Sequence, residues 1–341
     1  MSNLFSGINA RLRGASSKPS PNSKSPISPT SEDGKLNSPG GLSQRSLSSS
    51  NLSSPSSKLP PVPASPLPPT ANMTGSTDDE LAAYHLPKPL PLWLNPAYAK
   101  QIVKGNFMTL SRRPKAVEQG EWVACQVVEH YRNLWNFVSI VYQKEENGQS
   151  ICNPTTCPRM SAGGNHSYTW LNNRFEPIEL PAYEYITLMQ RWISGKVDDE
   201  KVFPTNPAGV SFSQHQQLTP SAIATDGFDE YIGKRSGFPK EFSTICKTIF
   251  TQMFRVYAHL YWAHFVEPFY HLNLEKQLNS CFSHFVLAGM EMAMLTPQEL
   301  EPMQPLLDLW AANGTFPPDS KAYESANLKA GNRLLQLAGM A

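Results

Sequence analysis

The chain has 341 residues and a formal net charge of +1, from 29 lysines and arginines against 28 aspartates and glutamates. A balance this even gives no reason to expect binding to nucleic acid or to a membrane surface. No stretch approaches the run of about 20 apolar residues that crosses a bilayer, and the N-terminus lacks the apolar region of a signal peptide, so we expect a cytoplasmic or nuclear protein with reduced thiols.

The first 84 residues are dominated by serine and proline and contain almost no aromatic side chains. Such a composition cannot bury enough apolar surface to offset the entropy of ordering, which predicts a disordered tail over residues 1–84. The tail contains Ser-Pro dipeptides at Ser20, Ser25, Ser28, Ser38, Ser54 and Ser65. These serines are either sites for proline-directed kinases or chance pairs in a linker of this composition.

Aromatic and aliphatic residues become dense over 85–312, which is long enough for one hydrophobic core. After an extended, proline-rich stretch, apolar side chains recur every three or four positions over 118–143: Val123, Val127, Tyr131, Leu134, Val138 and Val141. This spacing predicts an amphipathic helix with one buried face.

The next segments alternate between loop and regular structure. Residues 147–165 are rich in Gly, Pro, Asn and Ser, which predicts a long loop. Residues 166–180 alternate in polarity around a central Asn-Asn pair, which predicts a short β-hairpin. Residues 181–200 return to helical spacing, with Pro181 suited to the first turn.

A polar insertion over 204–236 is predicted to be a long loop, and loops of that length are usually functional or disordered. A second long helix is predicted over 238–265, with one apolar stripe: Ile245, Ile249, Met253, Val256 and Leu260. Two more helices are predicted over 274–296 and 297–310, and the polar extension 313–341 is expected to fray. These patterns predict an all-α helical bundle with one small β-hairpin.

Two of the five cysteines, Cys152 and Cys157, stand in a C-x4-C arrangement inside the predicted loop. In a reducing compartment this pair suggests zinc, which takes four nitrogen or sulfur ligands in a tetrahedron. His259 and His264 form the histidine pair of comparable spacing. The long gap between the pairs excludes a zinc finger and suggests a metal that staples a loop to a distant core helix. The alternatives are incidental loop thiols and histidines satisfied within the core.

Residues five positions apart on a regular helix point about 140° away from each other, which is a geometric objection to this ligand set. Pro268 removes part of it, because a proline clashes with the carbonyl four residues earlier, here that of His264, and bends the helix. A catalytic zinc keeps one coordination position open, whereas four protein ligands leave none. With no H-E-x-x-H signature in the chain either, an enzyme is the weaker hypothesis.

Several motifs in order resemble the Mob (Mps-one-binder) family of kinase activators, over roughly 98–311. They are "EWVACQVVEHYRNLWN", "CNPTTCPRMSAG", "YTWLNN", "RVYAHLYWAHF" and "NSCFSHFVLAGMEMAMLTPQELEPMQPLL". The resemblance implies a Mob-type helical bundle with one structural Zn2+ per chain. It assigns four zinc ligands: Cys152, Cys157, His259 and His264. It also implies that the chain has neither catalytic activity nor a small-molecule substrate.

The resemblance further implies a partner, the N-terminal regulatory region of an NDR/LATS-type AGC serine/threonine kinase. Members of the family help to hold such kinases active, in polarised growth, morphogenesis and cell separation. Sites of polarised growth and the nucleus are therefore further expected locations. The positions that match the kinase-facing surface of the family are Gly105, Asn106, Phe107, Glu118, Glu121 and Trp122. Carboxylates at a helix start also stabilise the helix, so a purely structural role for the two glutamates is an equal alternative.

One difference separates this chain from the founding subgroup of the family, which reads phosphopeptides with a basic pair and an arginine just before "VYAH". Here Thr251 and Gln252 occupy the positions of the basic pair, and Arg255 is retained. One guanidinium can still pair with a phosphate, but two charge-assisted partners are missing. The sequence therefore resembles the second, Mob-two-like subgroup, from a fungus. A phosphopeptide-reading scaffold of the founding subgroup is the alternative.

Overall fold

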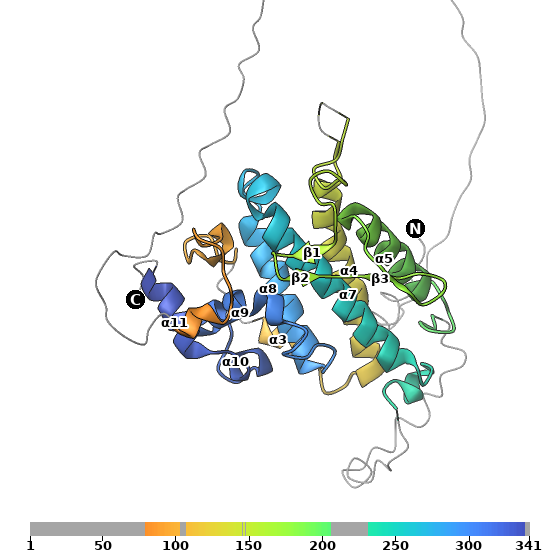
Figure 1. The fold of residues 1–341 in the computed structure, drawn as a ribbon. Coiled ribbons are helices and arrows are strands. Elements are labelled where there is room, and N and C mark those ends of the chain that lie inside the picture. Colours follow the sequence, from red (N-terminus) through yellow and green to blue (C-terminus); the bar gives the residue numbers. More distant parts are fainter. Residues whose placement is uncertain (1–78, 103–106, 145, 147, 206–230, 338–341) are drawn as a thin grey trace, which may run out of the picture. The chain divides into compact units, whose positions relative to one another are not determined.

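The structure is a computed structural model that describes residues 79–102, 107–144, 146, 148–205 and 231–337 (Figure 1). Most of the predicted tail and of the 204–236 insertion lies outside the described residues, as do Gly105 and Asn106. None of the helices within the described residues is both long enough and apolar enough to span a membrane.

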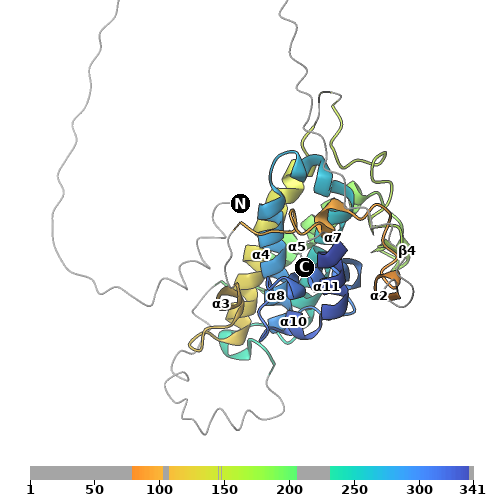
Figure 2. The same cartoon turned by 90° about the vertical axis from the view of Figure 1, so that its left-hand side faces the viewer.

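Four long helices carry the core: α4 (Gln119–Val141), α5 (Ala182–Val197), α7 (Phe242–His264) and α8 (Glu275–Glu291). Helix α7 packs against α4 and α5, and α4 also packs against α8 (Figures 1 and 2). The mostly helical fold is confirmed. Of the stripe predicted on α4, all but the half-buried Tyr131 are buried. On α7, all residues of the predicted stripe are buried except Ile245, which is half-buried.

Aromatic side chains fill the interior between α7 and α8. The rings of Phe250 and Phe285 stack with their centroids 5.2 Å apart, and Tyr257 lies 5.1 Å from both Phe282 and Phe285. Each of these side chains is fully buried. Full burial of one such ring stabilises the fold by about 1.5–3 kcal/mol, so this layer contributes much of the driving force for folding.

Two small antiparallel sheets lie between α4 and α5 in the sequence. Strand β3 (Trp170–Leu171) pairs with β4 (Pro177–Ile178), which confirms the predicted hairpin. Its turn is held by Asn172, whose Oδ1 accepts from the amides of Arg174 and Glu176. A second pair, β1 (Ser161–Ala162) with β2 (His166–Ser167), was not predicted, because strands of two residues are too short to show alternation.

Fraying after Trp310, expected from the polar sequence, is not what the structure shows. Helices α10 (Lys321–Glu324) and α11 (Leu328–Leu337) pack on α9 (Gln304–Ala312). The buried apolar residues of this extension are few, and only the last two share a helix, four positions apart on α11: Phe316, Ala322, Ala330 and Leu334. The backbones of α9 and α11 come so close at Gly331 that any Cβ there would collide with the carbonyl of Asp308.

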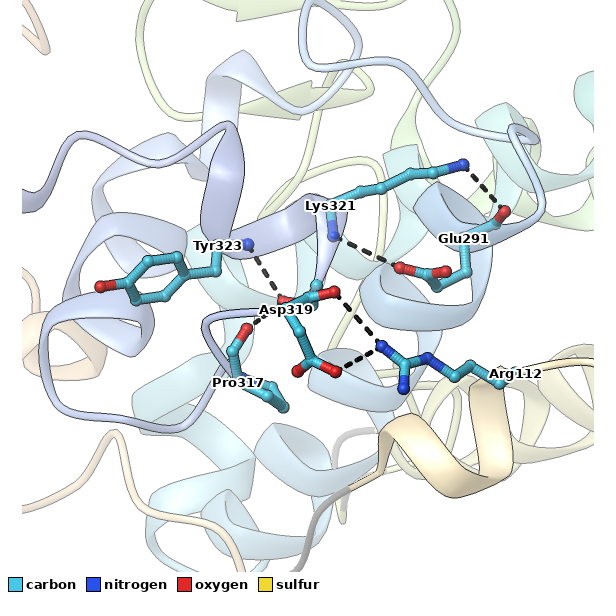
Figure 3. Close-up of polar contacts among 7 residues, drawn as sticks. Arg112, Glu291, Pro317, Asp319, Lys321 and Tyr323 are labelled. Atoms are coloured by element: carbon cyan, nitrogen blue, oxygen red, sulfur yellow. Dashed lines mark hydrogen bonds and ion pairs between the residues drawn. The ribbon is translucent and has the colours of Figure 1, made fainter.

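Polar contacts fix the same extension at its first turn. Figure 3 shows Arg112, which follows α3 (Met108–Ser111), paired with the carboxylate of Asp319. In the same view Lys321 donates from its backbone amide and its Nζ to Glu291 at the end of α8, at 3.3 and 3.1 Å. These exposed contacts are individually weak, so they fix the position of α10 more than they stabilise it.

A buried carboxylate ties both ends of the described domain together. Asp308 of α9 is fully buried and accepts hydrogen bonds from the Asn327 amide and from Gln304 Nε2, both at 2.7 Å. The hydroxyl of Tyr84 donates to its other oxygen. Burial raises the pKa of Asp308, and these three donors oppose that shift. Residues on either side of the predicted 85–312 domain therefore share one hydrogen-bonded centre.

Candidate metal centre

The loop that carries the cysteine pair is a tightly hydrogen-bonded turn. The amide of Cys152 donates to the carbonyl of Val141 at 2.9 Å, which joins the loop to the end of α4. Asn153 Oδ1 accepts from the amides of Thr155 and Thr156 at 2.8 and 3.1 Å, and the Cys157 amide donates to the Asn153 carbonyl at 2.8 Å. Both thiols are thereby turned into the protein, where they are buried.

The histidine pair lies at the end of α7, where the helix changes direction. Helix α7 ends at His264, whose φ of −128° leaves the helical region, and Pro268 lies in the π-helical turn Phe265–Tyr270 that follows. The predicted bend is therefore confirmed. It brings the rings of His259 and His264 to a centroid separation of 5.2 Å, and both are buried.

The four side chains converge on one point. Cys152 Sγ lies 3.8 Å from His259 Nε2, and Cys157 Sγ lies 3.5 Å from His264 Nε2. All four ligand atoms lie within 4.8 Å of one another. A tetrahedral zinc with bonds of about 2.3 Å to sulfur and about 2.1 Å to nitrogen separates S from N by about 3.6 Å. The buried cluster therefore has the donor set and the spacing of a metal site.

A hydrogen bond to the backbone sets the tautomer of one ligand. His259 Nδ1 lies 2.8 Å from the carbonyl oxygen of Ser161 in β1, and a carbonyl can only accept. The proton is therefore on Nδ1, and the lone pair of Nε2 points toward Cys152. Such outer contacts orient the ligands of metal sites and raise their basicity. Sequence reasoning did not find this partner, because a backbone carbonyl leaves no residue signature.

The thiols themselves are electrostatically unequal. A hydrogen bond from Cys152 lowers the pKa of Cys157. The same contact between the sulfurs, with burial, raises the pKa of Cys152. The protein groups alone therefore stabilise one thiolate. A divalent cation would compensate the charge of both and make each a ligand.

The residues predicted to face a kinase lie at the start of α4 and beside it. Glu118 is the N-cap of α4: its carboxylate accepts from the amides of Gly120 at 2.6 Å and Glu121 at 3.2 Å, and from Gly233 at 3.2 Å. The structural role weighed for Glu118 is thus observed. Trp122 is half-buried, as expected, and its indole donates to the Ser111 carbonyl at 3.3 Å.

Phe107, also among these residues, precedes α3 and stacks on the ring of His284, with centroids 5.5 Å apart.

The retained arginine of the founding subgroup has protein partners here. Arg255 Nη1 donates to the Tyr185 hydroxyl at 2.8 Å, and its guanidinium lies 5.0 Å from the centre of the Tyr168 ring. Tyr185 in turn donates to Gln252 at 2.7 Å. Thr251 donates to the carboxylate of Glu299 at 2.6 Å, so an acidic side chain adjoins one of the two substituted positions.

The chain is similar to several known proteins. A family model described as the Mob1/phocein family matches residues 99–231 and 229–303. The chain is 35% identical over 234 residues to the "Maintenance of ploidy protein mob2" of Schizosaccharomyces pombe, covering 69% of this chain and 79% of that protein.

Two proteins named "CBK1 kinase activator protein MOB2" match as well. The one from Candida albicans is 32% identical over 232 residues, which covers 68% of this chain and 63% of the relative. The one from Saccharomyces cerevisiae is 33% identical over 213 residues, which covers 62% of each. The chain thus spans less than two thirds of these two relatives. From the family match and the Mob2 relatives together, the chain belongs to the Mob1/phocein family and, within it, to the Mob2-like subgroup of fungal proteins.

Proposed function

We propose that this chain is a non-catalytic co-activator and adaptor that binds the N-terminal regulatory region of an NDR/LATS-type AGC kinase. The observation that carries the proposal is its similarity to Mob2 proteins, two of which are named as activators of the kinase CBK1. We further infer that the complex acts in polarised growth, morphogenesis and cell separation. The protein would then be cytoplasmic, enriched at growth sites and in the nucleus, which a fluorescent fusion tests.

The metal in this proposal is one structural Zn2+ per chain. Two thiols and two imidazoles in a tetrahedral arrangement are the ligand set of structural zinc sites, and a closed set of four leaves no position for a substrate. The cation would join the loop after α4 to the end of α7. Its role is to hold the two segments together rather than to take part in a reaction.

The contact surface that we propose lies at the start of α4 and along α3. Glu121 is half-buried in the first turn of α4, while Leu110 and Ile102 are 54% and 55% exposed. Phe107 and Trp122 contribute half-buried aromatic rings. Carboxylate and exposed apolar side chains together suit a basic amphipathic helix, whose apolar face would be buried and whose cations would pair at the rim.

The alternative role, reading phosphopeptides, finds less support. Arg255 already donates to Tyr185, and Glu299 beside Thr251 would repel a phosphate. Binding of a phosphothreonine peptide as tight as that of the kinase region would overturn our choice between the two roles.

The experiment is a titration of the purified kinase N-terminal region against wild-type protein and Glu121→Lys. We expect at least a tenfold loss of affinity, about 1.4 kcal/mol, and a weaker dependence on salt, because a rim charge that attracts cations is reversed. The matched control is Glu184→Lys. Glu184 is the third residue of α5, as Glu121 is the third residue of α4, so both reversals act at the same position relative to a helix dipole. Equal effects of both variants would refute the proposed surface.

A further inference from the structure

Two histidines that play no part in the metal centre meet beneath α3. His130 of α4 is fully buried, and its ring centroid lies 4.7 Å from that of His284 of α8. Among the described residues, neither ring nitrogen of His130 has a hydrogen-bond partner, and neither does Nε2 of His284. A buried imidazole is usually hydrogen-bonded, so the ring of His130, with both nitrogens unpartnered, needs an explanation.

The surroundings of the pair are aromatic. The ring of His130 contacts Phe285 at a centroid distance of 5.4 Å and Phe250 at 6.0 Å. On its outer side, His284 is covered by the stacked ring of Phe107. A positive charge on His130 would therefore be placed in an apolar interior with no acceptor bonded to it, which is unfavourable.

The same pair holds α3 in place. The carbonyl of Leu110 in α3 accepts a hydrogen bond from His284 and another, at 3.4 Å, from Gln126 Nε2 of α4. Together with the stacking of Phe107, these contacts attach both ends of α3 to the two histidine-bearing helices. Any change that forces His284 and His130 apart must also loosen α3.

The charged groups around the pair do not compensate a proton. Glu129 of α4 is the carboxylate that acts on His284, and it is exposed. His284 itself opposes a charge on His130. From α7 the ring in contact is Phe250, and from α3 the contacts are the Leu110 carbonyl and Phe107, none of which titrates. Burial lowers the pKa of both histidines.

We propose that His130 and His284 form a proton-sensitive clasp, neutral when closed, that releases α3 from α4 and α8 when the protein is acidified. The sign follows from linkage. Because the closed state binds fewer protons than the open state, the closed state loses stability as pH falls below the ordinary histidine pKa of about 6.5. Each histidine that stays neutral only when closed raises the opening constant by up to about tenfold per pH unit.

Native-state hydrogen exchange tests the clasp without any partner. The amides of Leu110, Ser111 and Arg112 are hydrogen-bonded within α3 and report its opening. We expect their opening constants, corrected for the intrinsic exchange rate, to rise by about tenfold or more between pH 6.5 and 5.5 in the zinc-loaded wild type. His130→Phe should lower this dependence to that of His284 alone. If the phenyl ring of His130→Phe does not fit in the core, His130→Leu is the second variant that tests the same loss of the imidazole.

The controls separate the clasp from other acid effects. His166→Asn removes a half-exposed histidine outside the cluster and should leave the exchange of α3 unchanged. Zinc content is measured at each pH, because protonation of the metal ligands would open the other end of the domain. Opening of α3 that does not depend on pH in the wild type overturns the proposal. So does a pH dependence that survives in both His130 variants and in the His130→Phe, His284→Phe double variant.

Discussion

Replacing His264 by alanine should remove the metal and unlink the loop from α7. Each Cys–His contact at the site joins residues 107 positions apart. Cross-linking a loop of about 100 residues removes about 4.7 kcal/mol of chain entropy from the unfolded state, by the estimate used for disulfides. For a domain of this size 1 kcal/mol corresponds to about 2–4 °C, so the melting temperature should fall by roughly 10–20 °C.

The assay is differential scanning calorimetry combined with elemental analysis of the purified protein. Wild type should contain one zinc per chain and His264→Ala close to none, and a strong chelator should shift the wild-type transition toward that of the variant. Cys125→Ser is the matched control, since Cys125 is a half-buried thiol outside the cluster. Zinc-free wild type, or a melting temperature of His264→Ala within a degree or two of the control, would refute the reasoning.

Three further predictions concern stability. Glu118→Ala should destabilise the domain by about 1 kcal/mol in denaturant titration, because it removes the N-cap of α4; an unchanged midpoint would contradict this. Gly331→Ala should lower the melting temperature because its Cβ meets the Asp308 carbonyl, whereas Gly195→Ala, with open space around it, should raise stability by about 0.5–1 kcal/mol. Deleting residues 1–78 should preserve cooperative melting. Deleting residues 313–341 should lower the melting temperature, since Leu334 is buried where α11 packs on α9 and the Asn327 amide donates to Asp308.

Sequence periodicity predicted the long helices well because their stripes extend over many turns. Val123 to Val141 on α4 and Ile249 to Leu260 on α7 repeat the helical period often enough to outweigh local exceptions. The predicted ligand pairs also lie together, because residue type and paired spacing are visible in one dimension. The two histidines reach the same side because α7 ends at His264. In the sequence, only Pro268 indicated this helix end.

The elements that the sequence did not predict have a common physical cause. Each is a short segment whose structure is set by contacts with residues that are distant in the sequence. The extension after Trp310 has too few apolar residues to predict a packed helix, yet Ala330, Gly331 and Leu334 suffice because α9 offers a surface that accepts them. The strands at Ser161 and His166 are set by the turn between them and by the Trp262 ring against Gly163. The Trp262 ring is about 100 residues away in the sequence, so no local pattern reveals this contact.

The start of α4 shows how the structure changes an experiment that sequence alone would suggest. Reversing both Glu118 and Glu121 would mix two effects, because Glu118 closes the helix and also accepts from Gly233, at the far end of the insertion. The Gly120 backbone touches Gly233 as well, with no room for a Cβ between them. Loss of binding in that double variant could thus arise from a displaced helix start. Reversing Glu121 alone keeps the Glu118 carboxylate on the amides of Gly120 and Gly233. A loss of affinity that Glu184→Lys does not share, at an unchanged melting temperature, then indicates a contact with the partner.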